Sequence, residues 1–364
     1  MKLRMLAYVC AALACTSAPL RAQTKSIYSN LANPAIGFNA LFLAQAARDL
    51  NEPYGPRFQE SEISLLSVVD PYWSLWANIV FAPDGVDPEE VYATTTKIPT
   101  IQLKIGKLRA AFGKQGLLHT HAFPFVQAPV IMANTIGEEG FKAAGMEVAW
   151  LTPSPWYCEL TGGIYQGAGA DAEHPLDFGS SAHDNVPFLG HLKNEVDLTD
   201  NTTMELGASA LSGKGTDGHT HAAYGADLTL RNVPLRRSNQ HGWILQGEYI
   251  EKGSYPGGTY SREQHGWYAS YQYRLSQIWW TGLRAEEALD SFTDVLTDPS
   301  TGDPVPGRIR RVSANVAWTP SEFSFVRLEY SIARADDGKG NAPLDRRLMV
   351  QMCYTIGYHP AHAY

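Results

Sequence analysis

Cationic residues, long apolar runs and cysteines are all scarce in this chain. Its 29 Lys and Arg residues are outnumbered by 37 Asp and Glu residues, which argues against a nucleic-acid-binding protein. After residue 22 no apolar run is long enough for a transmembrane helix. Only Cys158 and Cys353 follow that point, so a small disulfide-rich domain is excluded. By contrast, 32 Gly, 22 Pro and 11% aromatic residues favour many strands joined by turns.

The first 22 residues have the pattern of a secretory signal peptide. Lys2 and Arg4 precede an apolar run over residues 5–14, and a cleavage site follows at Ala22. Cys15 leaves a lipoprotein open as an alternative, and a retained membrane anchor is a third reading. We predict that residues 1–22 are a signal peptide and that residues 23–364 form one domain. An exported bacterial protein without a membrane helix is either periplasmic or an outer-membrane β-barrel.

Segments of about ten residues with alternating apolar and polar side chains recur along the chain. Residues 326–332 read VRLEYSI, and residues 350–356 read VQMCYTI. We predict strands at 36–47, 58–69, 72–82, 89–97, 99–107, 141–152, 155–166, 186–197, 202–212, 220–231, 241–253, 262–274, 278–289, 308–319, 323–334 and 346–358. The fold class is therefore all-β with about sixteen strands, and fourteen or eighteen remain open.

The connections between these segments favour a transmembrane antiparallel β-barrel over a soluble sandwich. Alternate links are short, as at 70–71, 153–154 and 320–321. The others, among them 83–88, 108–140 and 290–307, are longer and rich in Gly, Pro and Asp, with 232–240 as the exception. Short periplasmic turns and long external loops are typical of outer-membrane barrels, whose apolar strand faces meet lipid.

Several motifs resemble a known group of proteins. The run LKIGKLRAAFGK over residues 103–114, the following HTHAFPF, GEEG at 137–140 and the closing IGYHPAHAY are similar to bacterial outer-membrane porin-like proteins of the phosphate-selective porin superfamily (O/P-type). The resemblance implies an outer-membrane, porin-type barrel that allows diffusion and often forms homotrimers. It also implies that the third long loop, residues 108–140, folds inward and narrows the pore.

A barrel of about sixteen strands leaves an aqueous channel, which selects among solutes through charges at a constriction. The candidate charges near the long loop are Lys104, Lys107, Arg109, Lys114, Glu138 and Glu139. Opposed cations and anions there would sort polar solutes. The alternative is that they are ordinary solvated loop charges.

Two histidines in the same loop, His119 and His121, are candidate metal ligands. In an extended backbone they lie on one side, and with Glu138 or Glu139 they offer ligands for a divalent metal. A structural role is the preferred alternative, so no cofactor is predicted beyond this metal. If they line the constriction, we expect them to titrate near neutral pH. The pair His359 and His362 and the pair His219 and His221 carry no firm ligand spacing.

Local motifs for an enzyme are missing: there is no G-x-S-x-G elbow and no phosphate-binding glycine loop. The first hypothesis is therefore a porin for passive diffusion of small hydrophilic solutes or ions, in contact with outer-membrane lipid. The alternative is a metal-binding or surface-interaction barrel that uses its histidine-bearing loops. A metal-dependent barrel hydrolase is a third, less favoured hypothesis.

Overall fold

A computed structural model of the chain describes residues 34–47, 55–167, 175–180, 185–234, 240–297, 304–336 and 344–358. The predicted signal peptide and the closing segment with His359 and His362 lie outside these residues. The strands are β1 (Ala35–Ala47), β2 (Gly55–Val68), β3 (Trp73–Ala82), β4 (Gly85–Thr95), β5 (Ile101–Arg109), β6 (Lys142–Leu151), β7 (Tyr157–Tyr165), β8 (Phe188–Thr199), β9 (Thr202–Lys214), β10 (Thr220–Asn232), β11 (Gly242–Ser254), β12 (Ser261–Ser276), β13 (Trp279–Thr297), β14 (Pro304–Ser321), β15 (Ser324–Asp336) and β16 (Leu344–Gly357).

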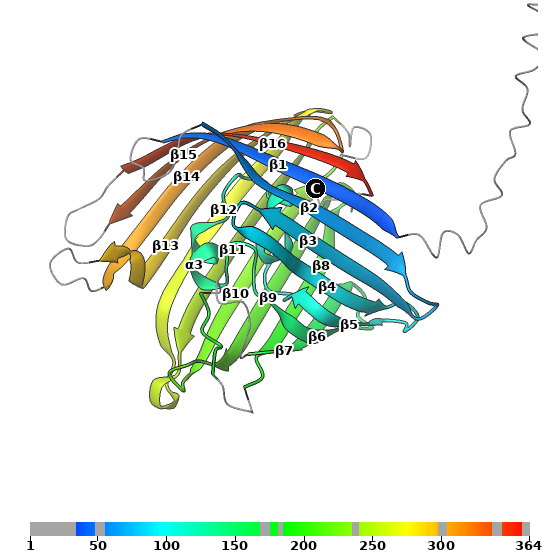
Figure 1. Ribbon diagram of the computed structural model, residues 1–364, viewed down its shortest axis with the longest axis vertical. Coiled ribbons are helices and arrows are strands. Elements are labelled where there is room, and N and C mark those ends of the chain that lie inside the picture. Colours follow the sequence, from blue (N-terminus) through cyan, green and yellow to red (C-terminus); the bar gives the residue numbers. More distant parts are fainter. Residues whose placement is uncertain are drawn as a thin grey trace, which may run out of the picture.

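These strands form a closed antiparallel barrel in which every strand pairs with its neighbours along the chain (Figure 1). The barrel closes where β1 pairs with β16, from Gly37 opposite Gly357 to Ala47 opposite Arg347. Closure leaves no unpaired sheet edge, which is the condition for a sheet to cross a bilayer. The predicted all-β barrel of about sixteen strands is confirmed.

One predicted long link is a tight turn instead. Residues 83–84 join β3 to β4, and the strand resumes at Gly85 rather than after residue 88. Gly85 and Pro88 resemble loop residues in the sequence. In the structure the register between β3 and β4 shifts between Asn78 and Val80, opposite the stretch that contains Pro88. A strand tolerates proline at such an irregularity, because no regular ladder hydrogen bond is required there.

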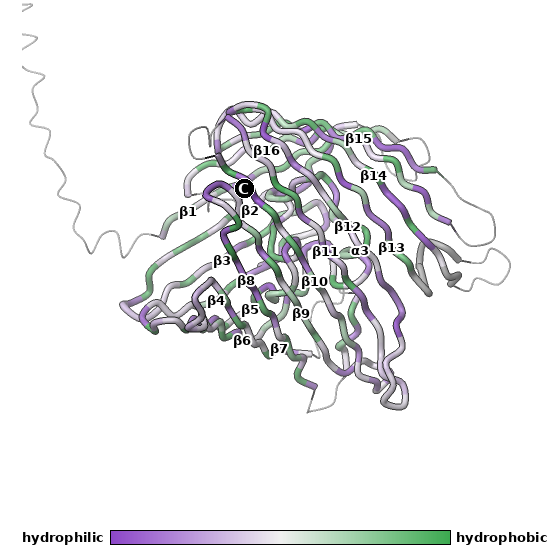
Figure 2. The backbone as a smooth tube through the Cα atoms, turned by 180° about the vertical axis from the view of Figure 1, so that it is seen from behind, coloured by the Kyte–Doolittle hydropathy of each residue, from purple (hydrophilic) through white to green (hydrophobic). Residues whose placement is uncertain are grey.

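Hydrophobic and hydrophilic residues follow one another along the strands, as the colours of the tube in Figure 2 show. Val316 and Leu328 point outward and are 41% and 48% exposed, whereas Ser313 points inward and is fully buried. The exposed apolar side chains form the lipid-facing surface expected of an outer-membrane barrel. Inside, many charged side chains are buried, which requires partners within the lumen.

The barrel wall is uneven in height and in pairing. β13 and β14 have 19 and 18 residues, whereas β5 and β7 have 9 each. β4 and β5 pair over only four positions, from Val91 opposite Lys107 to Thr94 opposite Lys104. Beyond Val91 the two strands separate, and the segment that follows β5 turns into the lumen.

That segment, residues 110–141, is called the constriction loop below. It contains the 3-10 helices η1 (Gln115–Leu117) and η2 (Thr120–Ala122) and the short α-helix α3 (Val130–Thr135). A further 3-10 turn, η3 (Pro256–Gly258), lies between β11 and β12. Among the described residues no helix is long and apolar enough to cross a membrane.

Candidate functional site

The constriction loop lies inside the barrel and has its own apolar core. Phe112, Ile131 and Met132 are at most 1% exposed and pack with residues of the wall. The ring of Phe141 makes edge contacts with Tyr165 and Phe178, each at 5.5 Å between ring centroids. The helix α3 contacts β11, β12 and β13 (Figure 1). The loop is therefore a packed part of the barrel interior, and its role as the constriction that the resemblance implies stays a prediction.

Carboxylates of the wall hold the backbone of the loop. Four wall glutamates each accept a hydrogen bond from one loop N–H: Glu147 from Ala111 (2.8 Å), Glu248 from Gln115 (2.6 Å), Glu329 from Val126 (2.7 Å) and Glu286 from Val130 (2.5 Å). Hydrogen bonds to a charged acceptor are about twice as strong as neutral ones. Because the four glutamates stand on β6, β11, β13 and β15, the loop is fastened at widely separated points of the wall.

Wall donors fasten the same loop through its carbonyl groups. Arg284 donates to the backbone oxygen of Gln127 (2.8 Å), and Arg311 donates to the Gln127 side chain (3.0 Å). Asn315 donates to the carbonyl of Pro124 (2.9 Å). The stretch from Pro124 to Val130 is thus held by β13, β14 and β15. This arrangement explains why so many polar side chains inside the barrel are buried and bonded.

A glycine allows the loop to enter the lumen. Gly113 has a φ of 64°, in the left-handed region that favours glycine. A Cβ atom there would overlap the carboxylate of Glu248. The same carboxylate accepts the N–H of Gln115, two residues later. Gly113 therefore permits the close approach that this bond requires.

The two loop histidines contact carboxylates of another part of the wall, on β2 and β4. His119 Nε2 lies 3.0 Å from Glu90, and its Nδ1 lies 3.3 Å from Glu89. His121 Nδ1 lies 3.1 Å from Glu62, and the two imidazole rings are stacked. These contacts with carboxylates fit the structural role that the sequence left as the preferred alternative.

The charge of His119 follows from this setting. Burial and the Arg109 cation lower its pKa, but the carboxylates around it, Glu62, Glu89 and Glu90, outweigh both and raise the pKa to about 10. His119 is therefore a cation at neutral pH, which differs from the expected titration near neutrality. The sequence could not show this, because the three glutamates come from β2 and β4.

The six predicted constriction charges occupy different settings. Arg109 is 4% exposed and lies with its guanidinium 3.2 Å from Glu89. Glu139 accepts the N–H of Thr120 (3.1 Å) and pairs with Lys142 (3.1 Å). Arg109 and Glu139 therefore belong to one network of ion pairs, which links the constriction loop to β4, β5 and β6.

The other four lie apart from that network. Lys107 pairs with Asp87 at 3.0 Å, and the Lys104 ammonium lies over the Tyr92 ring at 5.5 Å from its centroid. Glu138 is exposed on the loop. Lys114 faces a cavity between the loop and the wall, where it pairs with Glu205 at 2.7 Å. The structure thus brings Arg109 and Glu139 together, whereas Lys114 lines the cavity between the loop and the wall.

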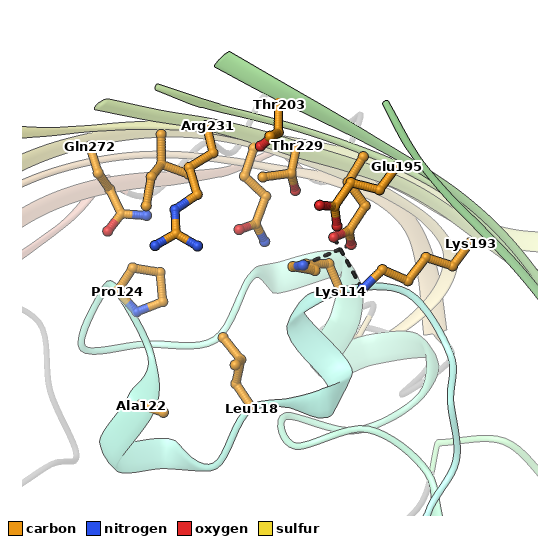
Figure 3. A pocket seen from close by; sticks show the side chains of 13 residues that line it. Lys114, Leu118, Ala122, Pro124, Lys193, Glu195, Thr203, Thr229, Arg231 and Gln272 are labelled. Carbon is orange, nitrogen blue, oxygen red and sulfur yellow. Dashed lines mark hydrogen bonds and ion pairs between the residues drawn. The ribbon is translucent and has the colours of Figure 1, made fainter. Parts of the chain in front are cut away.

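The cavity beside Lys114 has a volume of about 260 Å³ and is called the Lys114 cavity. Figure 3 shows loop residues Leu118 and Pro124 facing Arg231 and Gln272 of the wall. Lys193 also lines it and pairs with Glu205 at 3.2 Å. A second cavity of about 540 Å³ shares Pro124 and Gln272 in its lining, so the two are adjacent.

The second cavity, called the Trp280 cavity, opens toward the short turns. Its lining includes Arg274, Trp280, Phe325 and Arg327, together with turn residue Glu322. These wall residues were missed in the sequence, although strand parity carried the signal: Arg327 alternates with outward-facing Leu328. A charged residue on the inward face of a predicted barrel strand is a candidate pore residue.

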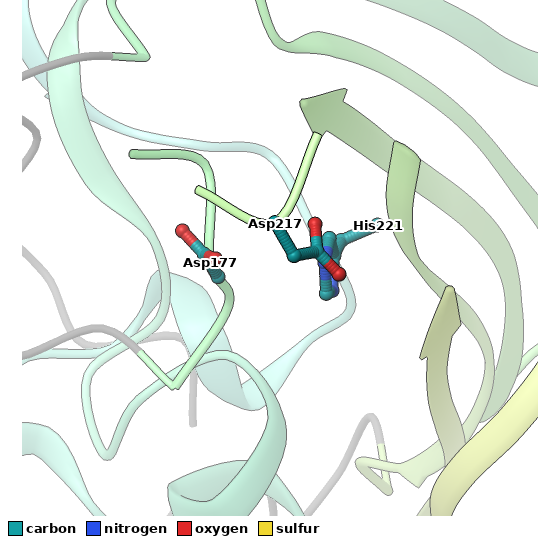
Figure 4. A group of neighbouring side chains, drawn as sticks. All are labelled: Asp177, Asp217 and His221. Atoms are coloured by element: carbon teal, nitrogen blue, oxygen red, sulfur yellow. The ribbon is translucent and has the colours of Figure 1, made fainter. Parts of the chain in front are cut away.

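A separate group of possible metal ligands lies at the long-loop end. Asp177, Asp217 and His221 place one ligand atom each within 4.8 Å of one another (Figure 4). His221 Nε2 lies 3.1 Å from Asp217, and Asp177 accepts the N–H of Thr216 at 2.8 Å. Among the residues that the structure describes, this group is a candidate for a divalent metal in addition to His119 and His121.

Comparisons with known proteins bear on this architecture. No protein-family model matches the chain. An uncharacterised protein of Aquifex aeolicus (strain VF5) is 28% identical over 349 residues, covering 87% of this chain and 71% of the relative.

Solved structures resemble the chain closely in fold. OprB of Pseudomonas putida has a TM-score of 0.62 at 6% identity, covering 89% of this chain and 94% of its own. An anion-selective porin of Comamonas acidovorans has a TM-score of 0.59 at 8% identity (89% and 99%), and a trimer form of OmpT of Vibrio cholerae 0.56 at 10% (89% and 99%). The fold is that of an outer-membrane porin. An outer-membrane location follows from this porin fold and from the apolar outward face.

Proposed function

We propose that this porin-like protein is a passive outer-membrane channel for small hydrophilic solutes, anions among them, without a catalytic step. The observation that carries the proposal is the constriction loop, bonded to the wall at both sides of the lumen. Between the loop and β8–β12 it leaves the Lys114 cavity, lined by Lys114, Lys193 and Arg231 against Glu195 and Glu205. A constriction with an excess of cations favours anions.

The six charges selected from the sequence have two roles in this proposal. Lys114 acts on the solute directly, because it lines the cavity. Arg109 and Glu139 act through the shape of the loop, because both are bonded within it or to the wall. Lys104, Lys107 and Glu138 contribute to the field around the constriction rather than to contact with the solute.

Conductance in planar bilayers tests the channel. The purified barrel should give stable steps in potassium chloride, and a salt gradient should give a reversal potential on the anion-selective side. Lack of conductance from barrels that show the folded β-sheet spectrum would reject the channel. Cation selectivity would keep the channel and reject the role given to Lys114, Lys193 and Arg231.

We also propose cleavage after Ala22 and assembly as a homotrimer in outer-membrane lipid. Support for the trimer is the resemblance noted above and the trimer form of the structurally similar OmpT of Vibrio cholerae. The mass of the intact protein from outer membranes would identify the mature N-terminus. Cross-linking in membranes followed by electrophoresis should give a species of three chains, and a monomer alone would reject the trimer.

A second function, metal binding at the outer loops, is supported by Asp177, Asp217 and His221. Two carboxylates and one imidazole suit a divalent transition metal. Isothermal titration with zinc should show one site that Asp217→Asn with His221→Gln removes and that His119→Gln leaves intact. Unchanged zinc binding in the double variant would reject this site.

A further inference from the structure

The Trp280 cavity combines two arginines with aromatic rings. The Arg274 guanidinium carbon lies 4.5 Å from the centroid of the Trp280 ring, and that of Arg327 lies 4.7 Å from the Phe325 centroid. All four side chains line the same cavity. The face of an aromatic ring attracts a guanidinium and holds it in place. The N–H donors of the guanidinium then point outward in the guanidinium plane. Both cations are therefore pre-oriented.

The remaining lining adds apolar surface and little opposing charge. Pro124 of the constriction loop and Ile278 of the turn before β13 contribute apolar groups. Glu322 is the acidic residue in the lining, against the two arginines. The cavity thus favours anions in a chain whose formal net charge is −8. Its volume of about 540 Å³ is in the range of small-molecule sites.

We propose that the Trp280 cavity is a binding site for solutes with one carboxylate and a flat apolar body, such as aromatic monocarboxylates. The carboxylate matches the planar N–H donors of a guanidinium, which can bind both of its oxygens. The flat body matches the rings of Trp280 and Phe325, which line the cavity beside the two arginines, because aromatic rings attract one another beyond the area that they bury. The inference rests on the proposed channel and names a solute class for it.

The position of the cavity gives the site its role in passage. It shares Pro124 and Gln272 with the Lys114 cavity, so a solute leaving the constriction enters it directly. Residues 319–322, at the end of β14 and in the turn that follows it, line the cavity on the short-turn side. A solute that binds here occupies the exit on the short-turn side and reduces the ion current while it stays.

Three probes separate charge from ring. Benzoate has both, acetate has the charge alone, and benzamide has the ring alone. Each is added to wild-type channels in potassium chloride at pH 7, and the concentration that halves the conductance is measured. We expect benzoate to act at about a tenfold lower concentration than either of the others. Equal half-blocking concentrations of benzoate and acetate would overturn the proposal.

Two adjacent tryptophans provide a matched control. Trp280→Leu removes the ring under Arg274, and Trp279→Leu removes its neighbour, which is 42% exposed on the outward face. Trp280→Leu should lose several-fold of the benzoate effect and keep the acetate effect, whereas Trp279→Leu should keep both. The half-exposed Arg274 offers a further variant, Arg274→Gln, which should weaken benzoate and acetate together. Identical benzoate block in the two tryptophan variants would overturn the site.

Benzoate binding to folded barrels in detergent distinguishes failure of the channel proposal from failure of the proposed binding site. If folded barrels show no conductance, the channel proposal fails, and calorimetric titration with benzoate then decides the site alone. Heat of binding that Trp280→Leu reduces and Trp279→Leu retains supports the site. Conductance without benzoate binding overturns the site and leaves the channel.

Discussion

His119 Nε2 of the constriction loop lies 3.0 Å from the Glu90 carboxylate of β4. A second carboxylate, Glu89, lies 3.3 Å from Nδ1 of the same ring. An imidazole between two carboxylates is stabilised as a cation, so this contact fastens the loop to the wall by charge. The relationship determines how the channel should respond to pH.

Because the pKa of His119 is raised to about 10, its charge should not change between pH 5 and 8. Its contribution to stability is fully present below the unfolded value of about 6.5 and is lost as the pH rises through about 10. Nuclear magnetic resonance of the ring protons should show His119 titrating near pH 10, far above the ordinary value of about 6.5 for an imidazole. A His119 titration midpoint near 6.5 would contradict the stabilisation of its cation by Glu89 and Glu90.

Gly113→Ala should loosen the constriction loop. A residue other than glycine at its φ of 64° costs about 1–2 kcal/mol, and the added Cβ overlaps Glu248. We expect noisier single-channel currents and a lower midpoint of thermal unfolding. Gly162→Ala is the control, since a Cβ there meets nothing within 4 Å. Identical currents from the two variants would show that Gly113 does not shape the loop.

Deleting residues 115–136 should enlarge the channel. The deletion removes η1, η2 and α3, while the strand ladders that close the barrel remain. Wall glutamates that held the loop then face water, where charge is well solvated. Single-channel conductance should rise several-fold, and removal of residues 256–258 in η3 should leave it unchanged. Conductance that stays at the wild-type level would mean that the loop does not limit the current.

Lys114→Gln should reduce anion preference. Lys114 lines the cavity and pairs with Glu205 at 2.7 Å, so the substitution removes one cation and leaves this carboxylate with Lys193. The reversal potential in a salt gradient should shift toward cation selectivity. Lys97→Gln, whose ammonium lies over the Tyr72 ring outside the cavity, is the matched control. An equal shift in both variants would assign selectivity to overall charge.

Leu328→Arg should impair assembly, since a charge on the lipid face costs about 2–4 kcal/mol at the middle of the bilayer. Thr203→Arg should be tolerated, because Thr203 lines the Lys114 cavity. Ser313 also faces inward but is fully buried, so an arginine there would not be a suitable control. Heat-modifiable mobility on gels reports the folded fraction. Equal folding of the two variants would contradict the assignment of faces.

The sequence by itself determined the barrel and the faces of its strands. Alternation such as VRLEYSI over residues 326–332 is a local property, because successive side chains of a strand point to opposite sides. It also located the constriction loop, since a connection of that length between strands is rare without a function. The tight turn at residues 83–84 was not predicted from the sequence, because Gly85 and Pro88 are compatible with both a loop and an irregular strand.

Only the tertiary structure decided which charges meet. Arg109 contacts Glu89, 20 residues away in the chain, and the N–H of Val126 reaches Glu329, 203 residues away. Such pairs depend on barrel closure and on the path of the loop, and neither has a local signal in the sequence. For the same reason the cations that line the cavities could be counted in the sequence but not placed. Their partners come from distant strands that closure alone brings together.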